Sequence, residues 1–219
     1  MLRVWLPDRP GALGAVASRI GAVRGDVVGI DILERGAGRA IDELVVDLPD
    51  DDLVDLLVQE VGQVDGVDVE DVRPVTTALH DPRLDALETA AMLVSARTAD
   101  ELLDALCVHG ARTLGASWAV VVDTELVELL ATHGSPPPTA WLVAFVAGSR
   151  SSAAVAGLDG RPDDVVWAPL AGAGLAVVVG RSSSAFRARE RRQAAALARI
   201  VDTRYRELAR AEHPAFRPR

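Results

Sequence analysis

The sequence predicts an α+β fold in two domains, residues 1–76 and 82–212, followed by a tail, residues 213–219. Two observations carry this prediction. Segments in which every second residue is apolar, as in strands, are interspersed with segments in which apolar residues recur every three to four positions, as in helices. His80-Asp81-Pro82 interrupts this pattern and is expected to be a linker. The 219 residues suit two small domains, each with its own core.

Composition excludes several classes of protein. The net charge of −9 argues against nucleic acid as a main ligand. No apolar run approaches the roughly 20 residues of a membrane span, and no signal peptide is evident, so we expect a cytoplasmic, bacterial protein with no membrane partner. All 23 basic residues are Arg, which removes any reaction that needs a Lys nucleophile or a Walker A Lys.

The first domain begins with a strand in which Leu2, Val4 and Leu6 alternate with Arg3 and Trp5. A helix follows Pro10, with an apolar face at 3.6-residue spacing. That face comprises Leu13, Val16, Ala17, Ile20 and Val23. Asp8 is the expected N-cap of this helix and Pro10 a first-turn residue.

Two strands follow, residues 27–33 and a strand in which Leu44, Val46 and Leu48 alternate with polar residues. Asp50-Asp51-Asp52 predicts the start of a second helix, because acidic side chains stabilise a helix N-terminus. Its expected buried stripe is Leu53, Leu56, Leu57 and Val61. A strand over residues 67–72 completes a βαββαβ order, as in ferredoxin-like folds. Both helices then cover one sheet face, and the other face, toward which Trp5 points, needs a cover.

The strand, the Asp8-x-Pro10-Gly11-x-Leu13 loop, the helix and the strand led by Gly25 together resemble an ACT domain. The resemblance implies pairing of two domains side by side and a small effector held between this loop and the start of the second strand. By position it implicates Asp8, Arg9, Gly11, Ala12 and Leu13, with Asp26, Val27 and Val28 opposite. Many members that bind amino acids carry Asn where this chain has Asp26 or Val27. The alternative is that the loop only caps a helix.

The second domain opens with a helix whose Leu84, Leu87, Ala91 and Val94 follow the spacing of a helix that packs along a partner. Thr98 and Glu101 form a capping-box pattern for a second helix, which ends at Gly115. An apolar strand at 117–123 pairs with 125–132, a short helix is expected at 139–146, and a second hairpin spans 165–180. Ser184 is expected to cap a long last helix.

This order, with Trp167-Ala168-Pro169-Leu170 and Gly174 to Gly180, resembles a GAF domain. The resemblance implies a small-molecule sensor or a dimerisation module. The cyclic-nucleotide signature of the family contains Asn and Lys, which this chain lacks. The segment 134–164 is short and rich in small residues, so any pocket there is expected to be small or collapsed. Cys107, the single cysteine, is expected to fill the core.

No catalytic set, metal site or cofactor is predicted, because the His and Cys residues lack the spacing of ligands. We therefore expect a non-enzymatic regulatory protein and a homodimer, whose ACT domain senses a small metabolite, most simply an amino acid. The alternative is a dimeric regulatory or scaffolding subunit that binds a partner protein and no metabolite. The Asp8–Leu13 loop distinguishes the metabolite sensor from the scaffolding subunit, because only the sensor needs free amides at the helix start to bind a carboxylate.

Overall fold

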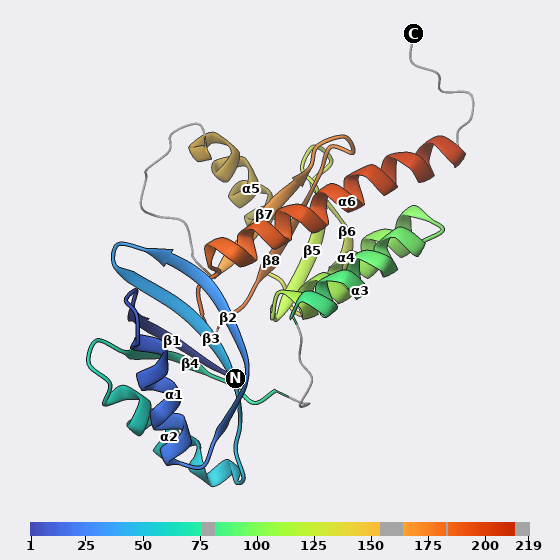
Figure 1. Ribbon diagram of the computed structural model, residues 1–219. Coiled ribbons are helices and arrows are strands. Elements are labelled where there is room, and N and C mark those ends of the chain that lie inside the picture. Colours follow the sequence, from blue (N-terminus) through green and yellow to red (C-terminus); the bar gives the residue numbers. More distant parts are fainter. Residues whose placement is uncertain (76–81, 154–163, 183, 213–219) are drawn as a thin grey trace. The chain divides into compact units, whose positions relative to one another are not determined.

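The computed structural model describes residues 1–75, 82–153, 164–182 and 184–212. It is a mixed α+β structure with two antiparallel four-stranded sheets and, within these residues, six α-helices. The chain divides into two compact units (Figure 1). The first comprises Met1–Asp81 with Arg187–Arg189, and the second comprises Pro82–Phe186 with Glu190–Arg219.

The first unit has the predicted βαββαβ order. Its elements are β1 (Leu2–Pro7), α1 (Ala12–Ala22), β2 (Asp26–Gly36), β3 (Arg39–Asp47), a 3-10 turn η1 (Asp51–Leu53), α2 (Val54–Gly62) and β4 (Asp68–Val72). The sheet order is β2-β3-β1-β4, so β2 and β4 are the edges. Both helices lie on one face of this sheet (Figure 1).

The core of the first unit follows the predicted alternation. Leu2, Val4 and Leu6 of β1 are buried against Val16 and Ile20 of α1. Trp5 lies on the opposite face, where the Arg39 guanidinium is 5.2 Å from its ring centroid. One expectation for α2 is wrong. Leu57 and Val61 are buried, but Leu56 is 42% exposed, because it lies about 100° around the helix from Leu57 and so falls outside the narrow stripe that Leu57 and Val61 form.

The second unit contains α3 (Pro82–Ser95), α4 (Ala99–Thr113), β5 (Trp118–Asp123), β6 (Glu128–His133), α5 (Thr139–Ala153), β7 (Val165–Leu170), β8 (Leu175–Gly180) and α6 (Ala188–Glu212). Its sheet order is β6-β5-β8-β7. Helices α3, α4 and α6 pack on one face, and α5 covers the other (Figure 1). Two separate hydrophobic clusters therefore sandwich the apolar strands β5 and β8.

Three sequence predictions for the second unit need correction. The helix expected at 139–146 extends to Ala153. The last helix begins at Ala188, so Ser184 lies four residues before it and is not at the N-cap position; its carbonyl accepts a hydrogen bond from Arg181 Nε at 2.8 Å. In the capping box, Thr98 accepts from the Glu101 amide as predicted, but Glu101 accepts from the Arg97 amide. The predicted small or collapsed pocket falls partly on residues 154–163, outside the described part of the chain.

The stripe of α3 that was expected to pack along a partner is solvent-exposed in this chain. Leu84, Leu87 and Val94 are 51%, 68% and 57% exposed. The opposite side of α3 buries Leu93. Among the described residues, no helix combines the length and the apolar character needed to cross a bilayer.

Candidate functional site

The predicted ligand loop joins β1 to α1 and is held by its own backbone. The Asp8 amide donates to the Gly38 carbonyl in the turn between β2 and β3 at 2.9 Å, and the Arg9 amide donates to the Pro7 carbonyl at 2.8 Å. Gly11 is the N-cap of α1, with φ 88° and ψ −15°. This left-handed conformation suits Gly, which has no Cβ to clash with the backbone.

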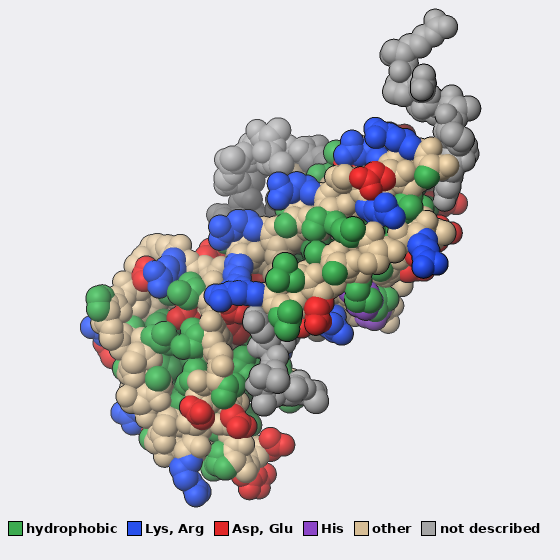
Figure 2. Space-filling view, turned by 45° about the vertical axis from the view of Figure 1, so that its right-hand side comes forward, with side chains coloured by type: hydrophobic (Ala, Val, Ile, Leu, Met, Phe, Trp, Pro, Cys, Tyr) green, Lys and Arg blue, Asp and Glu red, His purple; other side chains and the backbone are tan. Residues whose placement is uncertain are grey.

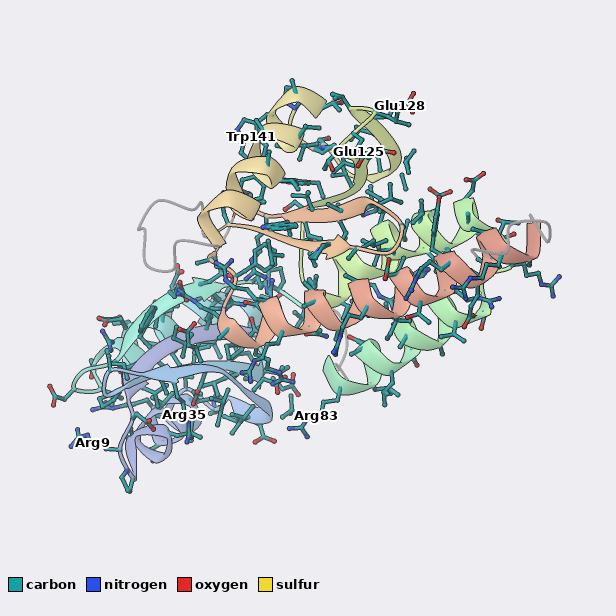
Figure 3. The ribbon with its side chains drawn as sticks, turned by 90° about the horizontal axis from the view of Figure 1, so that it is seen from above. Arg9, Arg35, Arg83, Glu125, Glu128 and Trp141 are labelled. Carbon is teal, nitrogen blue, oxygen red and sulfur yellow. The ribbon has the colours of Figure 1, made fainter. Side chains whose placement is uncertain are left out.

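The expected cap, Asp8, is wrong. No side chain caps α1, which begins at Ala12 rather than Pro10. A capping side chain belongs to the N-cap residue itself, and the left-handed Gly11 places that position three residues after Asp8. The Asp8 carboxylate lies instead 3.9 Å from Arg35 Nε, near the end of β2. Arg9 and Arg35 are labelled in Figure 3.

The absence of a cap leaves amides available at the start of α1. The Ala12 amide donates to the Arg9 carbonyl at 3.3 Å and the Ala15 amide to the Gly11 carbonyl at 3.0 Å. The Leu13 and Gly14 amides have no acceptor among the residues that the structure describes. The first turn carries no acidic residue. Open space surrounds Gly14, where an added Cβ would meet nothing within 4 Å. This end of α1 therefore presents unneutralised positive partial charge.

A groove of about 600 Å³ borders the same loop. Its walls include Arg9, Gly11, Ala12, Ala15, Arg19 and Asp65. Arg19 is engaged, since its Nη1 donates to Glu60 at 2.9 Å. Arg9 and Asp65 approach only to 3.9 Å, and both side chains are mostly exposed, so this pair is weak. The groove therefore lies beside the loop, and the exposed side chains of Arg9 and Asp65 make part of its wall polar.

The predicted site residues fall into two places in one chain. Asp8, Arg9, Gly11 and Ala12 lie together in the loop, and Leu13 packs half-buried against the core. Asp26–Val28 lies at the other end of α1. Asp26 pairs with Asp47 of β3, whereas Pro7 pairs with Arg39, eight positions away along that strand. At about 3.3 Å per residue the two parts are about 26 Å apart.

Asp42 is a functional candidate that the sequence analysis missed. It lies on β3 opposite Val4 of β1 and Ile32 of β2, on the face that the helices cover. Asp42 is 3% exposed, and its Oδ1 has no hydrogen-bond partner among the described residues. Burial raises the pKa of this carboxyl, the Asp8 charge raises it further, and Arg35 opposes both. The sequence does contain a sign of this: Asp42 lies two residues before the apolar Leu44 in a strand, so both side chains are expected on the same, buried face.

We expect Asp42→Asn to stabilise the protein at neutral pH by roughly 1 kcal/mol, because it removes a buried charge whose Oδ1 has no hydrogen-bond partner in the described residues. A folded-state pKa above the unfolded value means that ionisation opposes folding. The advantage of the variant should therefore grow as the pH rises from the unfolded value of 3.8 through the raised folded-state pKa. Urea unfolding of both proteins at pH 4 and pH 7 measures this. Asp65→Asn, at a fully exposed side chain, is the control and should change little.

Cys107 of α4 is buried in the core, as predicted. Burial raises the pKa of its thiol to about 12, with a contribution from Asp104. We expect the thiol to stay protonated and unreactive toward a disulfide reagent at pH 8 in the native state, and to react fully in denaturant. Rapid reaction of the folded protein would contradict this. Within the described ranges, no group of three or more His, Cys, Asp or Glu side chains could hold a metal ion.

No family model matches this chain, and no curated protein sequence matches it.

Proposed function

We propose that this chain is a non-enzymatic sensor of a small metabolite, an α-amino acid, which binds at the start of α1. The observation that carries the proposal is the uncapped helix: Leu13 and Gly14 present amides with no acceptor in the described part of the chain. Two such amides and the helix dipole are the standard means of binding a carboxylate. The likeness of the loop and of the βαββαβ order to an ACT domain supports the same site, and the second unit then corresponds to a GAF-like domain.

Asp42 contributes negative charge behind the loop, although its side chain is 3% exposed and does not line the groove. A buried carboxylate without a partner is costly, and a ligand cation would offset that cost. Asp8 supplies a second carboxylate close enough to influence the pKa of Asp42. In this proposal the effector carboxylate accepts from the amides of α1, while its ammonium group donates to the Asp8 carboxylate and is attracted by the charge of the buried Asp42.

Strand β2 provides an apolar surface beside this charge pair. Ile32, opposite Asp42, is 41% exposed, and Ile30 and Val28 are 46% and 48% exposed. An 11-residue edge strand with exposed apolar side chains favours pairing with another strand. We propose that two copies pair through β2, as the resemblance to paired ACT domains implies.

Pairing through β2 would complete the predicted site. A two-fold axis near Ile30 would set the partner's Val28 beside Ile32 and the partner's Asp26 beside Glu34. The residues Asp26–Val28, which lie far from the loop within one chain, would then come from the second copy. Because Asp26 and Glu34 of the two copies would repel each other, an effector with a basic side chain, which supplies a second cation, would favour this arrangement. Effector binding and dimer geometry would thereby be coupled, which is the requirement for allosteric output.

The test is a thermal-shift series with each of the twenty amino acids, followed by calorimetric titration of any that raises the midpoint. We expect at least one to bind, and its deaminated and decarboxylated analogues to bind less. Gly11→Val should abolish binding, since it disturbs the left-handed cap. Gly21→Ala, in the last turn of α1 with open space around it, is the matched control. If no amino acid shifts the midpoint, the proposal fails.

The exposed stripe of α3 favours a second candidate, a dimeric scaffolding subunit that binds a partner protein and no metabolite. Leu84, Leu87 and Val94 keep the spacing of a helix-helix interface. Leu87→Glu should then lower the oligomeric state in sedimentation, whereas Ile30→Glu in β2 should not. The opposite result would support the sensor dimer described above.

A further inference from the structure

The last helix, α6, carries a row of arginines along its solvent-exposed side. Arg192, Arg199 and Arg206 are exposed and seven residues apart, and the exposed Arg210 follows Arg206 by four. At about 100° and 1.5 Å per residue, these four positions lie within about 40° of one another and extend over about 27 Å of helix. The opposite side of α6 packs into the hydrophobic core. Figure 2 shows arginine side chains, in blue, spaced along the second unit.

The acidic residues among these turns do not neutralise the row. Asp202 Oδ1 accepts from two backbone amides in the turn between β7 and β8, at 2.8 and 3.1 Å, and its Oδ2 lies 3.4 Å from Arg206 Nη2. Glu207 pairs with an arginine outside the row, at 3.1 Å. Arg199 and Arg210 have no acidic partner among the residues that the structure describes. Part of the positive charge of the row is therefore left for an external group.

The folding of α6 does not explain this arrangement. Arg206 and Arg210 are four residues apart on one helix face, where like charges destabilise a helix. A helix face that serves only to be solvated commonly alternates acidic and basic residues, whereas the positions between these arginines hold small, uncharged side chains, Ala195, Ala196 and Thr203. Small side chains let a second helix approach closely. The row thus combines unneutralised charge with room for a backbone.

The charge of the row discriminates among possible partners. A second copy of α6 would bring arginines against arginines, and like charges across an interface are strongly unfavourable. A nucleic acid extends its negative charge beyond the row and would meet a chain whose net charge is −9. The aromatic residue of α6, Tyr205, packs against the core and could not stack on a base. An acidic helix of another protein meets none of these obstacles, because its charge is confined to the length of the row.

We propose that this exposed row of α6 docks an acidic α-helix of a partner protein. Carboxylates that recur every seven residues on one side of that helix pair with the guanidinium groups, and its backbone approaches α6 over the small residues between them. The proposal goes beyond both candidate functions. It uses residues of the second unit alone and does not depend on the effector site of the first unit.

The test uses a fluorescein-labelled, alanine-rich helical peptide of three heptads with Glu on one side. The same peptide with Gln in place of every Glu is the neutral probe, and a labelled DNA duplex of similar length tests the nucleic-acid alternative. Fluorescence anisotropy measures their binding to the full chain. At about 20 mM salt we expect the Glu peptide to bind at least about tenfold more tightly than the other two probes, and at about 300 mM salt its binding should fall about tenfold, because exposed charges are then screened.

Two double variants locate the binding surface. Arg199→Gln with Arg210→Gln should weaken binding of the Glu peptide about tenfold, from about threefold for each exposed ion pair. Arg24→Gln with Arg112→Gln removes the same charge at exposed positions outside α6 and should change binding less than about twofold. Equal losses in both double variants, equal binding of the Gln peptide or of the duplex, or no binding at low salt overturns the proposal. A lower oligomeric state of the first double variant in sedimentation also overturns it, since the row would then hold two copies of this chain together.

Discussion

Replacing Arg181 with Met is expected to lower the free energy of unfolding of the second unit by about 3–5 kcal/mol. The side chain is 1% exposed and forms charge-assisted bonds to three carbonyls and one carboxylate. Its Nε, Nη1 and Nη2 donate to the carbonyls of Ser184, Leu114 and Ala185 at 2.8, 2.9 and 2.8 Å. Its Nη1 also lies 2.7 Å from Glu190 Oε1. Replacing Arg181 with Met removes the cation paired with the buried Glu190 carboxylate and the donors to the three carbonyls.

Urea unfolding followed by tryptophan fluorescence measures this loss, since three of the four tryptophans lie in the second unit. Arg210→Met, at an exposed position of α6, the helix that carries Glu190, should change stability by less than about 0.5 kcal/mol. The double variant Arg181→Met with Glu190→Leu should recover much of the loss, because it removes both charges. A loss below about 1 kcal/mol for Arg181→Met would show that this network does not hold β8 to the chain leading into α6.

Gly134→Ala is expected to destabilise the second unit by about 3 kcal/mol or more. Gly134 follows β6 with φ +72°, a left-handed conformation that costs a residue with a Cβ about 1–2 kcal/mol. An added Cβ would also lie 2.2 Å from the Ser117 carbonyl oxygen and 3.0 Å from the Trp118 Cα. These are backbone atoms, which cannot rotate away as the end of a side chain can.

Gly174→Ala separates the two causes. Gly174 has nearly the same φ, +74°, but an added Cβ there meets nothing within 4 Å. This variant should therefore cost only about 1–2 kcal/mol, the conformational part alone. Thermal or urea unfolding of both variants gives the difference. Equal losses would mean that the chain relaxes around Gly134 and that the close approach to Ser117 has no energetic consequence.

The order of the elements could be predicted because each strand and helix carries its own spacing of apolar residues. Leu2, Val4 and Leu6 require a strand with one buried face, and Val16 and Ile20 require a helix above it. The same local pattern could not reveal how the chain enters α1. That depends on the left-handed Gly11 and on a hydrogen bond from the Asp8 amide to Gly38, about 30 residues away.

The candidate site was predictable to a similar extent. The loop residues Asp8, Arg9, Gly11 and Ala12 are adjacent in sequence and lie together in the structure. Asp42 could be found only by noticing an acidic residue at an inward position of β3, because its proximity to Asp8 arises from strand pairing. Nothing local to Arg181 indicated that it would bind carbonyls from separate segments.

The burial of Cys107 has a practical consequence for any optical study of this protein. The native thiol is enclosed and the chain contains no Lys, so neither maleimide nor amine-directed dyes should modify folded side chains. A cysteine introduced on the surface away from the groove, at the exposed Ser135 for example, would be the only cysteine accessible to a fluorophore. Energy transfer between copies that each carry one donor or one acceptor dye could then measure association, and Cys107 would not first have to be replaced.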